Sequence, residues 1–196
     1  LRYAPPPEYL TVVARVSVRY YSTWWQRIVI RKGSDDGVRA GCPVIFSDRV
    51  IGKVAVAHHT TSEVDLITSP NFRCTGFLEG DDQNRIVLVT GAPGRGLATG
   101  RARVSAIPQD YFYPAVGGAP KVMTTGLGGV YPAGLILGHL EGSQRTTQDG
   151  NFRESSLAPT RDLFSLQEVT VLVPKYPTPG ETLLEDQAQK RLDELR

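Results

Sequence analysis

The chain is poor in cysteine, histidine and long apolar runs. Its 196 residues include two cysteines and three histidines, which are too few for a disulfide framework and lack the spacing of a zinc site. No apolar run reaches the roughly 18 residues of a transmembrane helix, and no signal peptide is present. A net charge of +2 without a long basic block does not indicate nucleic-acid binding. We therefore expect no metal, cofactor or nucleic-acid ligand.

The two cysteines and the first residue bear on the cellular context. We interpret Cys42 and Cys74 as small buried residues, and a bridge between them stays open if the compartment is oxidising. The chain begins at Leu1 and not at methionine, so we expect it to be part of a longer protein. The missing apolar run therefore says little about a membrane anchor elsewhere in that protein.

Glycine, proline and short apolar runs are abundant. The 20 glycines and 14 prolines separate β-branched stretches at intervals of roughly 8–12 residues, which is typical of a small barrel or sandwich. We predict an all-β fold with strands at residues 10–20, 26–31, 43–46, 50–57, 63–67, 72–78, 86–89, 101–107, 121–124, 135–140, 151–156 and 168–173. A proline-rich linker and a short terminal helix are expected at 176–196, where apolar residues share one helical stripe.

A glycine-rich segment lies between two of these strands. Gly33, Gly37 and Gly41 follow the β-branched run Ile28–Ile30 at a spacing of four residues, and Pro43 restarts an extended segment. An Asp-Gly pair at Gly37 suits a turn with positive φ, so we predict structural turns. A nest of backbone amides that binds an anion is the alternative, but two adjacent aspartates would repel an anion.

A related pattern recurs later in the chain and suggests a second unit. Residues 122–138 carry further predicted glycine turns, at Gly126, Gly128, Gly129 and Gly134. We therefore predict two small six-stranded-type β-barrels, over residues 24–78 and 79–175. In strand 10–20, Val12, Ala14, Val16 and Val18 alternate with polar residues, although Val13 breaks the order. This strand is expected to pair with residues 169–173 and to complete the second barrel.

No catalytic constellation stands out. His58 and His59 lie near Ser62 and Asp65, but no Gly-x-Ser-x-Gly elbow is present, and adjacent strand residues point to opposite faces and do not share a metal. The loop at 91–96 lacks the lysine and Ser/Thr of a phosphate-binding loop. Carboxylates of a glycosidase can lie far apart in a chain, and nothing singles out a pair. The sequence therefore favours a non-catalytic protein.

Several segments together resemble one family. Ile30–Val44 resembles the I-x-K-G-S-x-D-G-V-x-x-G-x-P-V signature of the rod shape-determining protein MreC. In the same order, residues 50–54, 62–70, 124–135 and 162–173 resemble its G-x-V, S-x-V-x-L-I-T-D-P, T-S-G-L-G-G-x-F-P-x-G and D-L-x-x-L-x-x-V-x-V-L segments. The resemblance covers roughly residues 12–173. Cys42 stands where an apolar residue is usual, and the segment 108–120 is unusual.

This resemblance implies a fold, a location and partners. It implies two barrels on the periplasmic side of the inner membrane, anchored in the full-length protein by one N-terminal helix that precedes a coiled coil. It implies a non-catalytic, self-associating scaffold that maintains cell shape and docks peptidoglycan synthesis enzymes. The implied partners are MreB, MreD, RodA and the elongation-specific penicillin-binding protein.

Two other functions stay open at this point. A periplasmic glycan- or ligand-binding module would bind peptidoglycan fragments in a calorimeter. An unusual barrel hydrolase would be labelled by a nucleophile-reactive probe. A full-length sequence with a secretory signal, and with neither a transmembrane helix nor heptads, would exclude the family.

Unpaired strand edges and clustered aromatic residues are the expected contact surface, because open edges pair with other chains and Trp and Tyr are enriched at interfaces. The aromatic candidates are Trp24, Trp25, Tyr111, Phe112 and Tyr113. Covering one end of a barrel is the alternative role of the two tryptophans.

The double substitution Trp24→Ala and Trp25→Ala is expected to weaken self-association and partner capture by about tenfold or more, as truncation of central aromatic contacts does. Sedimentation velocity and a pull-down measure the two effects, and a circular dichroism melt checks that the variant is folded. Unchanged association and capture would remove this pair from the contact surface.

Overall fold

The computed structural model describes residues 4–21, 26–92, 100–111, 118–127, 129–146, 150–159, 163 and 165–176. This part of the chain forms twelve strands and one short 3-10 helix, so the predicted all-β fold is confirmed. The helix and strands are β1 (Tyr9–Tyr21), β2 (Gln26–Ile30), η1 (Ser34–Asp36), β3 (Pro43–Phe46), β4 (Arg49–Ala57), β5 (Ser62–Leu66), β6 (Arg73–Leu78), β7 (Val87–Ala92), β8 (Arg101–Pro108), β9 (Lys121–Thr124), β10 (Ile136–Thr146), β11 (Phe152–Ala158) and β12 (Glu168–Pro174). Among the described residues, no helix has the length and apolar character needed to cross a membrane. The linker and helix predicted over residues 176–196 lie outside the described residues, except that residue 176 is described.

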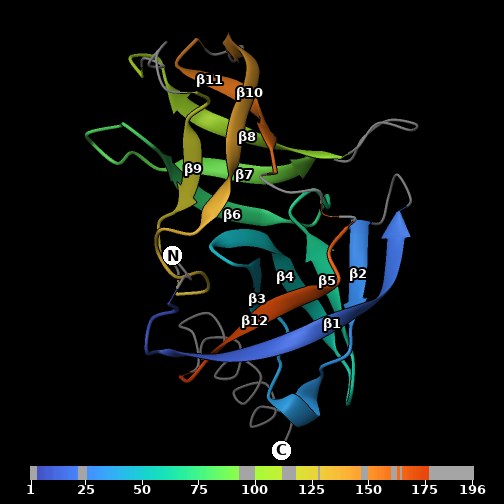
Figure 1. The fold of residues 1–196 in the computed structure, drawn as a ribbon. Helices are drawn as coiled ribbons and strands as arrows, with labels where there is room; N and C mark the ends of the chain where they lie inside the picture. The colour runs from blue at the N-terminus through green and yellow to red at the C-terminus, as the bar shows by residue number, and fades with distance from the viewer. Residues whose placement is uncertain are drawn as a thin grey trace, which may run out of the picture.

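Strand pairing closes two rings of six strands each. The first ring runs β1–β2–β5–β4–β3–β12 and returns to β1, and the second runs β6–β7–β8–β11–β10–β9 and returns to β6. The first ring lies in the lower half of Figure 1 and the second in the upper half. Every described strand therefore pairs with two others. The pairing is not continuous, because β1 pairs with β12 along Tyr9–Arg15 and with β2 along Val16–Tyr21. Each half of β1 thus has one edge without a paired strand among the described residues.

The rings differ from the expected division of the chain. Strand β1 does pair with β12, for example Leu10 with Val173 and Ala14 with Val169. Both strands, however, complete the first ring, because β1 also pairs with β2 and β12 also pairs with β3. Strand β6, assigned by sequence to the first barrel, belongs to the second. Apolar alternation identifies a strand but does not name its neighbours.

A bulge in β1 reverses the face of its second half. Ala14 is only 1% exposed, as the alternation predicts, but Val18 is 42% exposed. The register shifts between Val16 and Val18, and one extra residue in a strand moves all later side chains to the other face. Val18 therefore lies on the surface and not in the core, and the apolar alternation from Ala14 through Val16 to Val18 gives no sign of the shift.

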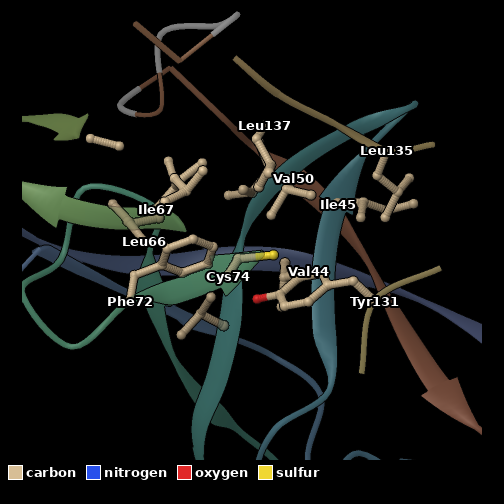
Figure 2. Packing of buried hydrophobic residues seen from close by; sticks show 14 of the residues in the cluster. Val44, Ile45, Val50, Leu66, Ile67, Phe72, Cys74, Tyr131, Leu135 and Leu137 are labelled. Carbon is tan, nitrogen blue, oxygen red and sulfur yellow. The ribbon is translucent and has the colours of Figure 1, made fainter. Parts of the chain in front are cut away.

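The two rings share a continuous apolar core. Figure 2 shows its part around the junction, where Phe72 and Cys74 from the second ring lie close to Val44 of the first, with Tyr131 beside them. A single parallel bridge joins Ile136 of β10 to Arg49 of β4, and the Ile136 amide donates to the Asp48 carbonyl at 2.8 Å. The two cysteines, Cys42 and Cys74, are both buried and form no disulfide.

The first glycine segment forms a tight turn that packs against the β4–β5 connection. Gly37 and Gly41 have φ of +80° and +88°, which glycine adopts at little cost. Gly33 has a different role, because a Cβ there would lie 2.2 Å from the His58 carbonyl oxygen. The same carbonyl accepts a hydrogen bond from the Ser34 amide at 2.8 Å. Gly33 therefore permits close backbone contact, and Gly37 permits a left-handed conformation.

This difference predicts unequal costs for two alanine substitutions. Gly33→Ala should lower the free energy of unfolding by about 3 kcal/mol or more, because the clash is with backbone that has to move. Gly37→Ala is the matched control and should cost about 1–2 kcal/mol, since it meets no neighbour and suffers only left-handed strain. Urea denaturation measures both, and equal losses would contradict the close contact at Gly33.

Candidate functional site

Of the five aromatic residues predicted to form a contact surface, only Tyr111 is among the described residues; Trp24, Trp25, Phe112 and Tyr113 lie outside them. Tyr111 is 3% exposed, and its hydroxyl donates to the Glu79 carbonyl at 2.8 Å. Its ring is part of the core, because the Pro108–Tyr111 turn folds it inward against β6. Tyr111 therefore does not offer its ring to a partner.

An ion-pair cluster stabilises the loop that follows β6. The Arg85 guanidinium donates to Asp81 from Nε at 3.2 Å and from Nη2 at 2.8 Å, and to Asp110 from Nη1 at 2.6 Å. The hydrogen bonds from Arg85 hold the pKa of the Asp81 carboxyl below its usual value. Arg153 Nη2 donates to the carbonyl of Tyr111 at 2.5 Å. This cluster joins the loops at one end of the second ring and is a structural feature.

The second glycine segment is a fixed loop at the junction of the two rings. Gly126, Gly129 and Gly134 have φ of +76°, +69° and +83°, while Gly128 lies outside the described residues. Thr124 is fully buried, and its Oγ1 donates to the Pro132 carbonyl at 2.5 Å and accepts from the Leu135 amide at 3.0 Å. The sequence analysis missed this threonine, although its place at the start of the glycine pattern was a signal.

A hollow lies on the outside of the first ring. It has a volume of about 680 Å³ and lies over β1, β3 and β12. Its lining consists of Pro5, Thr11, Val13, Ile45, Phe46, Ser47, Glu168, Val169 and Thr170. We call it the outer hollow. Val13 is 60% exposed at the outer hollow, and Leu10 on the same strand is 54% exposed. Apolar side chains at such positions are available for contact with another protein.

The residues considered for catalysis contact other groups and not one another. Ser62 donates its hydroxyl hydrogen to the Lys32 carbonyl at 2.7 Å, and Asp65 accepts from Arg27 at 2.5 Å. His58 and His59 approach different carboxylates, Glu63 and Asp35 respectively, each at 3.7 Å. In the described ranges, no group of three His, Cys, Asp or Glu side chains is placed to hold a metal ion. The sequence neighbours therefore do not assemble into a triad.

Comparison with known proteins identifies the family. A profile described as "Rod shape-determining protein MreC, barrel core" matches residues 16–173. The chain belongs to the MreC family. The cell shape-determining protein MreC of Listeria monocytogenes is 29% identical over 167 residues, which are 84% of this chain and 54% of that protein. The chain thus spans about half the length of this relative.

Solved MreC structures share the fold. MreC of Listeria monocytogenes matches with a TM-score of 0.71 and 28% identity, over 87% of this chain and 78% of that one. MreC from Pseudomonas aeruginosa matches with a TM-score of 0.68 and 19% identity, over 83% and 98%. A complex between penicillin-binding protein PBP2 and MreC from Helicobacter pylori matches with a TM-score of 0.61 and 10% identity, over 84% and 98%. The last two likenesses concern the fold alone.

The lowered pKa of Asp81 predicts a pH-dependent contribution to stability in this MreC family member. A depressed carboxyl pKa stabilises the folded state above the ordinary value of about 4, and the contribution is lost as pH falls through the folded pKa. Asp81→Asn should therefore lower the free energy of unfolding at pH 7, and its difference from the parent protein should shrink towards zero below about pH 4.

Denaturant unfolding at several pH values measures this difference. Asp82→Asn is the matched control, because Asp82 is the exposed neighbour and forms none of the Arg85 contacts given above; it should change little at any pH. A deficit of Asp81→Asn that stays constant down to pH 2 would show that the Arg85 contact does not set the pKa.

Proposed function

We propose that this chain is the extracytoplasmic barrel region of a non-catalytic scaffold for bacterial cell-wall elongation. In this role it maintains cell shape by docking peptidoglycan synthesis enzymes. Membership of the MreC family supports the role in cell shape. The complex of PBP2 with MreC in Helicobacter pylori supports an elongation-specific penicillin-binding protein as a direct partner.

The proposal extends to the rest of the protein. We infer a location on the periplasmic side of the inner membrane and an anchor outside these residues, in keeping with a relative of which this chain covers 54%. Self-association and contacts with MreB, MreD and RodA belong to the same proposal. They follow from the family resemblance.

The outer hollow is the feature that best supports the proposed docking of a synthesis enzyme. Both rings are closed, which leaves a partner little strand edge to extend. We infer that side chains on the outer faces make most of the contact. Val13 is more than half exposed and lines a hollow of about 680 Å³, and apolar side chains of this kind form the centre of protein interfaces. We infer that the penicillin-binding protein contacts this face.

The substitution Val13→Glu should weaken binding of the periplasmic part of the elongation-specific penicillin-binding protein by about tenfold or more, because a charge is buried against an apolar contact. Biolayer interferometry with the purified partner measures the dissociation constant, and sedimentation velocity reports self-association. Val13 is exposed, so the variant should keep its unfolding midpoint.

Val56→Glu is the matched control, because Val56 is 41% exposed on β4 and does not line the outer hollow. It should bind like the parent protein. Weakened binding by Val56→Glu with unchanged binding by Val13→Glu would move the docking face away from the outer hollow. Equal binding by both variants and the parent would remove the apolar surface of the first ring from the proposal.

A further inference from the structure

Three neighbouring strands of the second ring carry positive charge and no negative charge. Strands β6, β7 and β8 pair in this order in the upper half of Figure 1. Together they contain Arg73, Arg101 and Arg103 but no aspartate or glutamate. Arg101 pairs with Glu141 of β10. Neither Arg73 nor Arg103 forms an ion pair with a described residue, so these two arginines lack a counter-charge.

The strand register places the two arginines on either side of one threonine. Arg73 is opposite Thr90, and Thr90 is opposite Arg103. Val89 beside Thr90 and Val104 beside Arg103 are fully buried. Because successive side chains of a strand alternate between its faces, the three opposed residues share the outer face of the ring. We call them the arginine row. Its two arginine Cα atoms are about 10 Å apart, which is two strand spacings, so both guanidinium groups can reach one anion above the threonine.

The first ring contains the same arrangement with an aspartate in the middle. Lys53 is opposite Asp65, and Asp65 is opposite Arg27. Arg27 Nε donates to Asp65 Oδ1 at 2.5 Å. The middle strand of that ring therefore supplies a negative charge between two cations. The arginine row has a neutral threonine at the corresponding position, so its own strands supply no such charge.

The carboxylates of the adjoining strands are opposed to other cations. Glu141 on β10 contacts Arg101, and Glu154 on β11 is opposite Arg145 in the strand register. Two cations held near each other repel, and an anion from solution would relieve this repulsion. The half-buried Thr90 between them has a hydroxyl that can donate one more hydrogen bond. The arginine row therefore has the charge and the donors for a bound anion.

We propose that the arginine row binds the phosphate group of a phosphate monoester. A monoester carries close to two negative charges at neutral pH, which matches the two guanidinium charges. Each guanidinium can donate two hydrogen bonds to a phosphate, and the threonine hydroxyl donates another. A carboxylate carries one charge and two oxygens, so it satisfies this set only in part. The arginine row lies on the second ring and the outer hollow on the first, so phosphate binding does not depend on docking at the outer hollow.

Glycerol 3-phosphate is the soluble probe, added to the ¹⁵N-labelled 196-residue chain at constant ionic strength. Saturable shifts should appear at the amides of Arg73, Thr90 and Arg103. Acetate should bind at least about tenfold more weakly, as expected when hydrogen bonds to a charged group are lost. Added salt should weaken binding of the phosphate. Absence of saturation with glycerol 3-phosphate, or equal binding of acetate, would overturn the proposal.

A phosphate monoester can be free in solution or part of a lipid headgroup, and vesicles distinguish these two sources. The chain is floated with phosphatidylcholine vesicles, with and without phosphatidic acid, whose headgroup is a monoester. Capture that requires phosphatidic acid and both arginines supports the site and assigns its ligand to a lipid. Binding of glycerol 3-phosphate without capture by vesicles supports the site and assigns its ligand to a free phosphate ester.

Two variants test the cations of the row. Arg73→Gln and Arg103→Gln should each weaken binding of glycerol 3-phosphate by about tenfold or more, because each removes charge-assisted hydrogen bonds. Arg31→Gln is the matched control and should bind normally, since Arg31 is an exposed cation directly after β2 on the first ring. Unchanged affinity in both row variants would overturn the site. An equal loss in Arg31→Gln would also overturn it, because it would show only non-specific charge attraction.

A third variant supplies the anion from the protein itself. Thr90→Asp places a carboxylate between the two arginines, in the position that Asp65 has in the first ring. It should weaken binding of glycerol 3-phosphate by about tenfold or more, because the new carboxylate repels the phosphate and pairs with the arginines. Thr90→Asn is the neutral control and should bind like the parent protein.

The unfolding midpoints of these two variants give a second reading that needs no ligand. Thr90→Asp should unfold at a higher temperature than Thr90→Asn, because only the aspartate neutralises the two arginines, and added salt should reduce the difference. Equal midpoints would show that the arginines do not converge over Thr90. Equal phosphate affinity of the two variants would likewise overturn the placement of the anion.

Discussion

The antiparallel pairing of β1 with β12 is the contact on which the first ring depends. It joins residues as distant in sequence as Leu10 and Val173, so the whole second ring is inserted between the strands that close the first. Strand β1 can do this because it is 13 residues long: its first half pairs with β12 and its second half with β2. Contacts between such distant residues are slow to form.

Closure of both rings also decides how the molecule can meet partners. Each described strand pairs with two others, which limits the edges that otherwise attract other strands. Binding can then use side chains and hollows on the outer faces. The outer hollow is broad and lies over three strands of the first ring, which suits contact with a protein surface.

Much of the fold was predictable from local patterns, and the errors have physical causes. The alternation of apolar residues and the positions of glycine and proline predicted the strands and the all-β class, because both depend on neighbouring residues. The bulge after Val16 was not predictable, since it leaves the alternation intact while turning Val18 outward. Tyr111 was expected on the surface but lies in the core, because the aromatic content of a segment does not say which way a turn folds it.

The sequence by itself determined the strand content, the turn glycines and the family, because these depend on the types of neighbouring residues and on the order of motifs along the chain. Only the tertiary structure decided which strands close each ring. Only the structure showed that Gly33 is needed for contact with the His58 carbonyl, while Gly37 is needed for its φ. The contact between the Phe72 and Tyr131 rings also belongs to the tertiary structure, because the two residues come from separate segments. Their proximity is a consequence of strand pairing, and no local pattern records it.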